Sequence, residues 1–153
     1  MAVRARYPDA QAACIPVLHL AQDEFGYLSD EALALVATTL GLVESHVLGV
    51  ATFYTMFHRK PRGRYVLMVC TNVSCMLNGG YRVLERIAAR LGIKPGETTP
   101  DGKFTLIEEE CLAACADGPM AMLDQKYYLR LSTPEQVDAM LDELNRLPAE
   151  GKR

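Results

Sequence analysis

Residues 64–75 read Arg64-Tyr65-Val66-Leu67-Met68-Val69-Cys70-Thr71-Asn72-Val73-Ser74-Cys75. The residues before Cys70 form an almost continuously apolar run, which is typical of a strand in the middle of a sheet. Cys70 closes this run, and Cys75 follows after four intervening residues. The segment therefore predicts a buried strand that presents a pair of cysteines at its carboxyl end.

A second cysteine pair, Cys111 and Cys115, follows a second predicted strand that contains Phe104 and Leu106. If the two strands are parallel neighbours, their carboxyl ends lie at the same edge of the sheet, and both cysteine loops rise from that edge. Four thiolates that converge on one point are what a metal centre needs. We therefore expect one four-cysteine site rather than two separate sites.

The rest of the second half predicts one helix between these strands, and two strands and a helix after them. Residues 78–92 show apolar positions at helical spacing and end in glycine. Further strands are expected over residues 120–123 and 127–131. Thr133 and Gln136 form a capping box that starts a last helix. The order β-α-β-β-β-α matches a thioredoxin-like fold, in which the first two strands are parallel.

The first half of the chain predicts helices. Apolar residues recur at helical spacing over residues 10–25, although Pro16 is expected to kink this helix or to mark a false start. A second helix is expected over residues 29–41, with Ser29 as its N-cap, and a third over residues 44–51.

The boundary between the halves is expected in residues 58–63, a polar segment rich in chain breakers. We expect an N-terminal helical bundle segment over residues 1–60 and a thioredoxin-like domain over residues 61–153. The chain is therefore predicted to be an α+β protein.

Composition excludes several classes of function. The 153 residues are 50% hydrophobic and 23% charged, with a net charge of −3, so no basic patch predicts nucleic-acid binding. No apolar stretch is long enough to span a membrane, and the first residues lack the apolar core of an export signal. A reducing compartment is expected, where cysteines more often bind metal than form disulfides. The fifth cysteine, Cys14, lies on an apolar helix face and is predicted to be a small buried hydrophobe.

Three kinds of four-cysteine site are compatible with the spacing: a structural zinc site, an iron–sulfur cluster and two disulfides. Four and three intervening residues are admissible for zinc, but a two-plus-two arrangement suits a cluster of two irons, with one cysteine pair on each iron. A reducing compartment and the lack of a C-x2-C motif count against disulfides. The spacing therefore favours iron over zinc.

No sequence motif predicts chemistry of the chain's own. Neither a G-x-G-x-x-G after a strand nor a phosphate-binding loop is present, and no nucleophile–base or paired-carboxylate arrangement can be argued. We therefore predict no catalytic residues and no NADH or flavin site, so that the chain is an electron relay within a larger enzyme.

Five ordered blocks carry a family resemblance that covers about residues 10 to 146. They are Ile15-Pro16-Val17-Leu18-His19-Leu20-Ala21-Gln22, Gly49-Val50-Ala51-Thr52-Phe53-Tyr54-Thr55-Met56-Phe57, Cys70-Thr71-Asn72-Val73-Ser74-Cys75, Gly96-Glu97-Thr98-Thr99-Pro100-Asp101-Gly102 and Glu110-Cys111-Leu112-Ala113-Ala114-Cys115. The blocks resemble the E subunit of bacterial NADH:quinone oxidoreductase, respiratory complex I, in the thioredoxin-like 2Fe–2S ferredoxin family.

The resemblance implies that residues 61–153 form a domain holding one 2Fe–2S cluster, with Cys70, Cys75, Cys111 and Cys115 as its ligands. It implies docking on the flavin- and NADH-binding subunit of the same complex, alongside further complex I subunits, with FMN and NADH bound to that partner only. It also implies a cytoplasmic location, peripheral to the inner membrane.

Two alternatives stay open at this point. The same module occurs in related subunits of NAD-linked hydrogenases and formate dehydrogenases. A zinc-stabilised four-cysteine interaction domain without a redox role is an alternative of another class.

Overall fold

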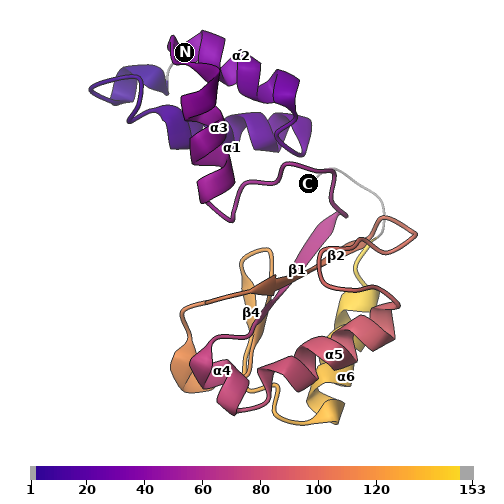
Figure 1. Cartoon of the computed structure of the whole chain (residues 1–153). Coiled ribbons are helices and arrows are strands. Elements are labelled where there is room, and N and C mark those ends of the chain that lie inside the picture. The colour runs from indigo at the N-terminus through magenta and orange to yellow at the C-terminus, as the bar shows by residue number, and fades with distance from the viewer. Residues whose placement is uncertain (1–2, 149–153) are drawn as a thin grey trace. The chain divides into compact units, whose positions relative to one another are not determined.

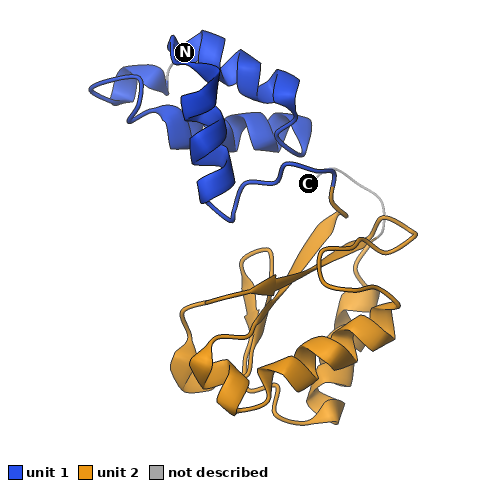
Figure 2. Cartoon of the chain, in the orientation of Figure 1, with its two compact units in different colours: residues 1–61 blue, residues 62–153 orange. Residues whose placement is uncertain are grey.

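The computed structural model describes residues 3–148. The chain divides into two compact units between Pro61 and Arg62 (Figure 2). The division falls inside the polar segment of residues 58–63. Each unit has a hydrophobic core of its own, as two separate clusters of buried side chains show.

The first unit contains three α-helices, α1 (Cys14–Phe25), α2 (Asp30–Leu40) and α3 (Glu44–Phe53), after a short 3-10 turn at Arg4–Arg6 (Figure 1). Ser29 caps α2 as predicted, because its Oγ accepts a hydrogen bond from the Ala32 N–H at 3.2 Å. Gly26 and Gly41 end α1 and α2 in the left-handed conformation that glycine adopts at low cost.

Pro16 does not kink the first helix. The helix begins at Cys14, so Pro16 lies in its first turn, where no intrahelical partner is lost. The apolar pattern upstream of Cys14 was therefore a false start. Cys14 is 1% exposed in the core of this unit, as predicted, and burial raises the pKa of its thiol.

The second unit contains a four-stranded sheet in the order β2-β1-β3-β4. Its strands are β1 (Tyr65–Cys70), β2 (Phe104–Glu109), β3 (Ala121–Leu123) and β4 (Lys126–Tyr128). β1 and β2 are parallel, which confirms the prediction, while β3 is antiparallel to both β1 and β4. The expected fourth strand was too long, because pairing ends at Tyr128.

Alternate residues of β1 face different surroundings. Leu67 and Val69 enter the main core with α5 (Gly80–Leu91) and α6 (Pro134–Asn145), which lie along one face of the sheet in Figure 1. Met68 and Cys70 belong to a smaller apolar cluster on the other face. The period of two along a strand thus directs Cys70 away from the main core.

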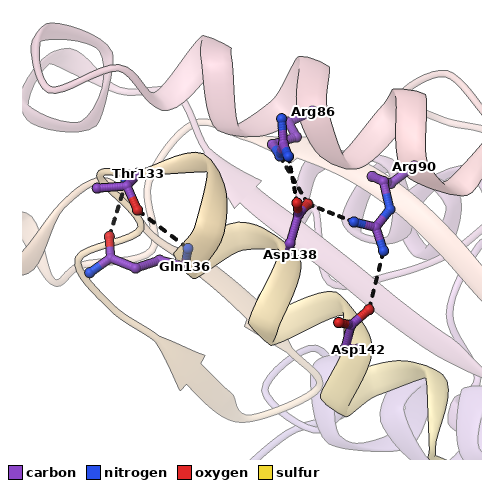
Figure 3. Close-up of polar contacts among 6 residues, drawn as sticks. All are labelled: Arg86, Arg90, Thr133, Gln136, Asp138 and Asp142. Carbon is purple, nitrogen blue, oxygen red and sulfur yellow. Dashed lines mark hydrogen bonds and ion pairs between the residues drawn. The ribbon is translucent and has the colours of Figure 1, made fainter.

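The two long helices of this unit are joined by charged side chains (Figure 3). Asp138 of α6 accepts a hydrogen bond from Arg86 Nε of α5 at 2.9 Å, and Arg90 bridges Asp138 and Asp142 at 2.7 and 3.2 Å. The predicted capping box of α6 is present. These contacts fix the helix pair that supports the sheet.

Two short elements of the second unit were not predicted. Val73–Leu77 forms the helix α4, which was expected to be loop, and Cys115–Asp117 forms a 3-10 turn, η2. Among the described residues no helix is both long enough and apolar enough to cross a membrane.

Candidate metal centre

The first cysteine loop is fixed by β1 and α4. Cys70 is the last residue of β1 and pairs in register with Glu109 of β2. The side chain of Asn72 accepts a hydrogen bond from the Val73 N–H and caps α4. The cap starts a helix that turns Cys75 back toward Cys70, and Cys75 and Cys70 are 1% and 3% exposed.

Gly80 allows this loop to close. A Cβ at Gly80 would lie 2.8 Å from the Cys70 carbonyl oxygen and 3.0 Å from the Cys75 carbonyl carbon. No side chain fits such an approach to rigid backbone, so glycine is required between the two cysteines and α5.

The second cysteine loop contacts the first through a hydrogen bond and close packing. The Ser74 hydroxyl donates a hydrogen bond to the Cys115 carbonyl oxygen at 2.8 Å, so α4 is tied directly to η2. Gly118 packs against Cys75, because a Cβ at Gly118 would lie 2.9 Å from the Cys75 Sγ. The Gly118–Pro119 peptide bond is cis.

A cavity of about 440 Å³ opens between the two loops. It is lined by residues of both, namely Cys70, Asn72, Val73, Ser74, Cys75, Leu77, Asn78 and Cys115. Three of the four predicted ligands thus line one cavity, but their side chains are not close enough together to form a metal-binding group in the described residues. Their surroundings are mixed, since Leu112 and Met120 are buried against the cysteines whereas Leu77 is 75% exposed at the rim.

Cys111 is the predicted ligand that the structure does not bring into this cavity. Its side chain is exposed, and within residues 3–148 no group of three or more Cys, His, Asp or Glu side chains is assembled closely enough to hold a metal ion. Its backbone is nevertheless beside the site. The Cys70 thiol lies 3.7 Å from the Glu110 carbonyl oxygen, and Leu112 packs with Cys70 and Cys75.

The loop at Cys111 is held in a conformation that points an N–H group at sulfur. Ala113 has a positive φ of 60°, and its N–H donates to the Cys111 Sγ at 3.4 Å. A positive φ is uncommon for alanine and marks a locally constrained backbone. Hydrogen bonds of this kind stabilise thiolate ligands and tune the metal that they bind.

The electrostatics of the site resist thiolate formation. Burial raises the pKa of Cys75 to about 11, and contact with the Cys70 thiol and the nearby sulfurs of Cys70 and Cys115 act in the same direction. The Met120 N–H, hydrogen-bonded to Cys75, opposes this shift. Clustered sulfurs without a cation repel each other's negative charge, and a bound metal reverses that balance.

The donor set therefore fits a thiolate-bound metal centre. All five cysteines are free thiols, and three of them line one cavity. The residues on either side of Cys111, Glu110 and Leu112, both contact Cys70. Metal binding requires the Cys111 side chain to turn inward and the other three sulfurs to move closer together. A cation-filled site would supply the driving force for that turn.

The sequence did not predict the contacts that assemble the site. Ser74, Gly80 and Gly118 act through neighbours far away in the chain or through close approach of backbone, and neither effect leaves a local pattern. α4 did have a signal, because Asn72 is a favoured N-cap residue directly before an apolar run.

Comparison with known proteins identifies what the chain resembles. A family model described as Thioredoxin-like [2Fe-2S] ferredoxin matches residues 1–145. The NADH-quinone oxidoreductase E 2 subunit of Rhizobium meliloti (strain 1021) is 45% identical over 141 residues, which are 92% of this chain and 83% of that protein. The NADH-quinone oxidoreductase E subunit of Escherichia coli (strain K12) is 40% identical over 89% of this chain and 81% of its own length.

One relative is longer than this chain. The NADH-quinone oxidoreductase E subunit of Mycobacterium tuberculosis (strain ATCC 25618 / H37Rv) is 42% identical over 91% of this chain, but over only 55% of its own length. Among solved structures, an NAD+-reducing [NiFe]-hydrogenase in the air-oxidized state is similar with a TM-score of 0.72 and 23% identity. That match covers 92% of this chain and 25% of the hydrogenase chain, and it shows a shared fold.

Proposed function

The chain belongs to the Thioredoxin-like [2Fe-2S] ferredoxin family, and from this premise we propose that it is the electron-transfer subunit of an NADH-quinone oxidoreductase. We assign its one 2Fe–2S cluster to Cys70, Cys75, Cys111 and Cys115. The observation that carries the assignment is the cavity between the two loops, to which Cys70, Cys75 and Cys115 contribute.

A bound 2Fe–2S cluster supplies one-electron transfer, and the chain supplies ligation, burial and orientation. β1 and α4 hold the first cysteine pair in place before any metal arrives. Leu112 and Met120 shield these sulfurs from water on one side. The N–H groups of Met120 and Ala113 point at the sulfurs of Cys75 and Cys111 and stabilise their charged forms.

The partner in this proposal is the subunit that binds FMN and NADH. The exposed side chains of Val73 and Leu77 border the cysteine cavity, so an apolar partner surface could cover the site and bring a flavin near it. The location that we propose with this partner is cytoplasmic and peripheral to the inner membrane.

The test of the cluster is anaerobic purification followed by a visible spectrum, metal and sulfide analysis, and EPR of the reduced protein. We expect two irons and two sulfides per chain and an EPR signal from one unpaired electron per cluster. A colourless, EPR-silent protein with one zinc per chain would overturn the cluster and support a zinc-stabilised interaction domain.

The identity of the complex is tested by affinity purification of the tagged chain from its own host. Recovery of an FMN-containing, NADH-oxidising partner together with membrane subunits supports a quinone reductase. Recovery of a nickel–iron hydrogenase or a formate dehydrogenase would assign the same module to one of those enzymes.

A further inference from the structure

Asp117 introduces a negative charge into the second cysteine loop. It is the last residue of η2, which begins at Cys115, and it directly precedes Gly118, which packs against the Cys75 Sγ. Asp117 thus lies between Cys115, which lines the cysteine cavity, and Gly118, which packs against Cys75. Its carboxylate belongs to no ligand set proposed above.

Arg130 contacts Asp117 through both its side chain and its backbone. Arg130 Nε lies 2.8 Å from Asp117 Oδ1, and Nη2 lies 2.8 Å from the same oxygen. The Arg130 N–H donates to the Asp117 carbonyl oxygen at 2.8 Å. The segment after β4 therefore binds the turn that carries Cys115.

The same segment anchors this turn to the main core. The N–H of Leu131 donates to the Pro119 carbonyl oxygen at 2.8 Å, and the Leu131 side chain is buried in the core with α5 and α6. Arg130 itself has a positive φ of 55°, which is unfavourable for a residue with a Cβ. Such a conformation persists only where surrounding contacts hold it in place.

From these contacts we infer that Asp117 and Arg130 form a charge-compensated clamp, in which Arg130 positions the Cys115 turn and cancels the charge of Asp117 beside the cluster. The inference rests on the proposed function, because it assumes a cluster at the four cysteines. Neither residue is a ligand, and neither transfers the electron.

The clamp predicts opposite electrostatic effects for its two members. Reduction adds one negative charge to the cluster, so a nearby anion favours the oxidised form and a nearby cation favours the reduced form. D117N leaves the charge of Arg130 uncompensated and should raise the reduction potential. R130Q leaves Asp117 uncompensated and should lower it. The double variant D117N/R130Q should return close to the wild-type potential.

The test is an EPR-monitored redox titration of the purified, cluster-loaded chain at low salt. At the wild-type midpoint, each single variant should change the ratio of reduced to oxidised cluster by roughly twofold to threefold, as expected for a unit charge within a Debye length. R130K keeps the positive charge and should titrate like the wild type. D142N is the matched control, since Asp142 forms an exposed ion pair with Arg90 on α5.

Shifts of opposite sign in the two single variants, with recovery in the double variant, support the clamp. Shifts of equal sign, or shifts no larger than that of D142N, overturn it. If R130Q takes up no cluster, D117N and R130K decide: an unshifted D117N or a strongly shifted R130K overturns the inference. A wild-type chain without a cluster would instead refute the proposed function, so the two failures are distinguishable.

Discussion

The first cysteine pair lies inside the second unit, whereas the second pair lies at its surface. Cys70 and Cys75 are almost fully buried, between the end of β1 and the capped helix α4. Cys111 and Cys115 are exposed, on a loop with one 3-10 turn and a residue of positive φ. One pair is held by regular secondary structure and packing, and the other by a few hydrogen bonds across the loops.

The difference suggests a division of roles. The buried pair is preorganised, so its thiols contribute to folding as well as to ligation. The exposed pair contributes little to the apolar core, and its side chains take up their ligand positions only when metal binds. This division of roles predicts different effects of substitution in the two pairs.

Cysteine-to-serine variants should separate the two pairs most strongly. C75S and C111S should each lower cluster content by more than about tenfold, because each removes a thiolate ligand. Only C75S should also destabilise the metal-free chain, by about 1–3 kcal/mol, because it places a hydroxyl in a buried apolar cluster. Iron analysis and urea unfolding of the metal-free proteins measure both effects.

C14A is the matched control for these variants. Cys14 is equally buried but lies in the core of the first unit, so C14A should keep the cluster while losing some stability. Equal cluster contents in C14A and C75S would contradict the ligand assignment. Equal stabilities of metal-free C75S and C111S would contradict the division of roles.

Gly80→Ala tests whether the buried pair depends on close backbone approach. The added Cβ would meet the Cys70 carbonyl oxygen at 2.8 Å, and backbone there cannot move without disturbing β1. We expect a loss of about 1–3 kcal/mol of unfolding free energy and a lower cluster content. Gly49→Ala is the control, because nothing lies within 4 Å of its Cβ position in the exposed part of α3. It should be neutral or stabilise by up to about 1 kcal/mol.

Ser74→Ala removes the hydrogen bond that joins the two loops. The metal-free chain should lose only about 0.5–1.5 kcal/mol, since the bond is at the surface. The cluster, however, should dissociate several times faster in the presence of a chelator, which absorbance in the visible range follows. Ser132→Ala alters a serine in the same unit and should leave that rate unchanged. Equal rates in both variants would show that the loops are held by other contacts.

Acidic pH should weaken the pairing of α5 with α6, and only slightly. Hydrogen bonding from Arg86 and the charges of Arg86 and Arg90 hold the pKa of Asp138 below its ordinary value of 3.8. The stabilisation is therefore complete above that ordinary value and is lost as the pH falls through the lowered pKa. Thermal unfolding of the metal-free chain between about pH 5 and about pH 2 should show a smaller decline in D138N than in the wild type. An identical decline would assign the acid sensitivity to other carboxylates.

Local sequence patterns predicted most of the regular structure. Ser29 and the capping box at Thr133 mark helix starts because capping is a local hydrogen bond. The apolar run of β1 predicts a strand because burial on both faces of a sheet requires it, and Phe104 and Leu106 predict β2. The sequence left open whether Pro16 kinks the helix or marks a false start, because its position relative to the helix start depends on where packing lets α1 begin. The predicted fourth strand runs beyond the observed end of β4 at Tyr128, because pairing with the short strand β3 sets that end.

The candidate site also combines features that local sequence predicts with features that depend on the fold. Local patterns predict that two cysteine pairs follow two strands, and parallel pairing of those strands then brings both loops to one edge. The burial of Cys70 and Cys75, the exposure of Cys111, the Ser74–Cys115 hydrogen bond and the Arg130–Asp117 ion pair follow from the folded structure alone. The two kinds of information differ in how far along the chain the underlying interactions reach. Periodicity and capping act within a few residues, while burial, close backbone approach and charge compensation depend on which distant segments the fold brings together.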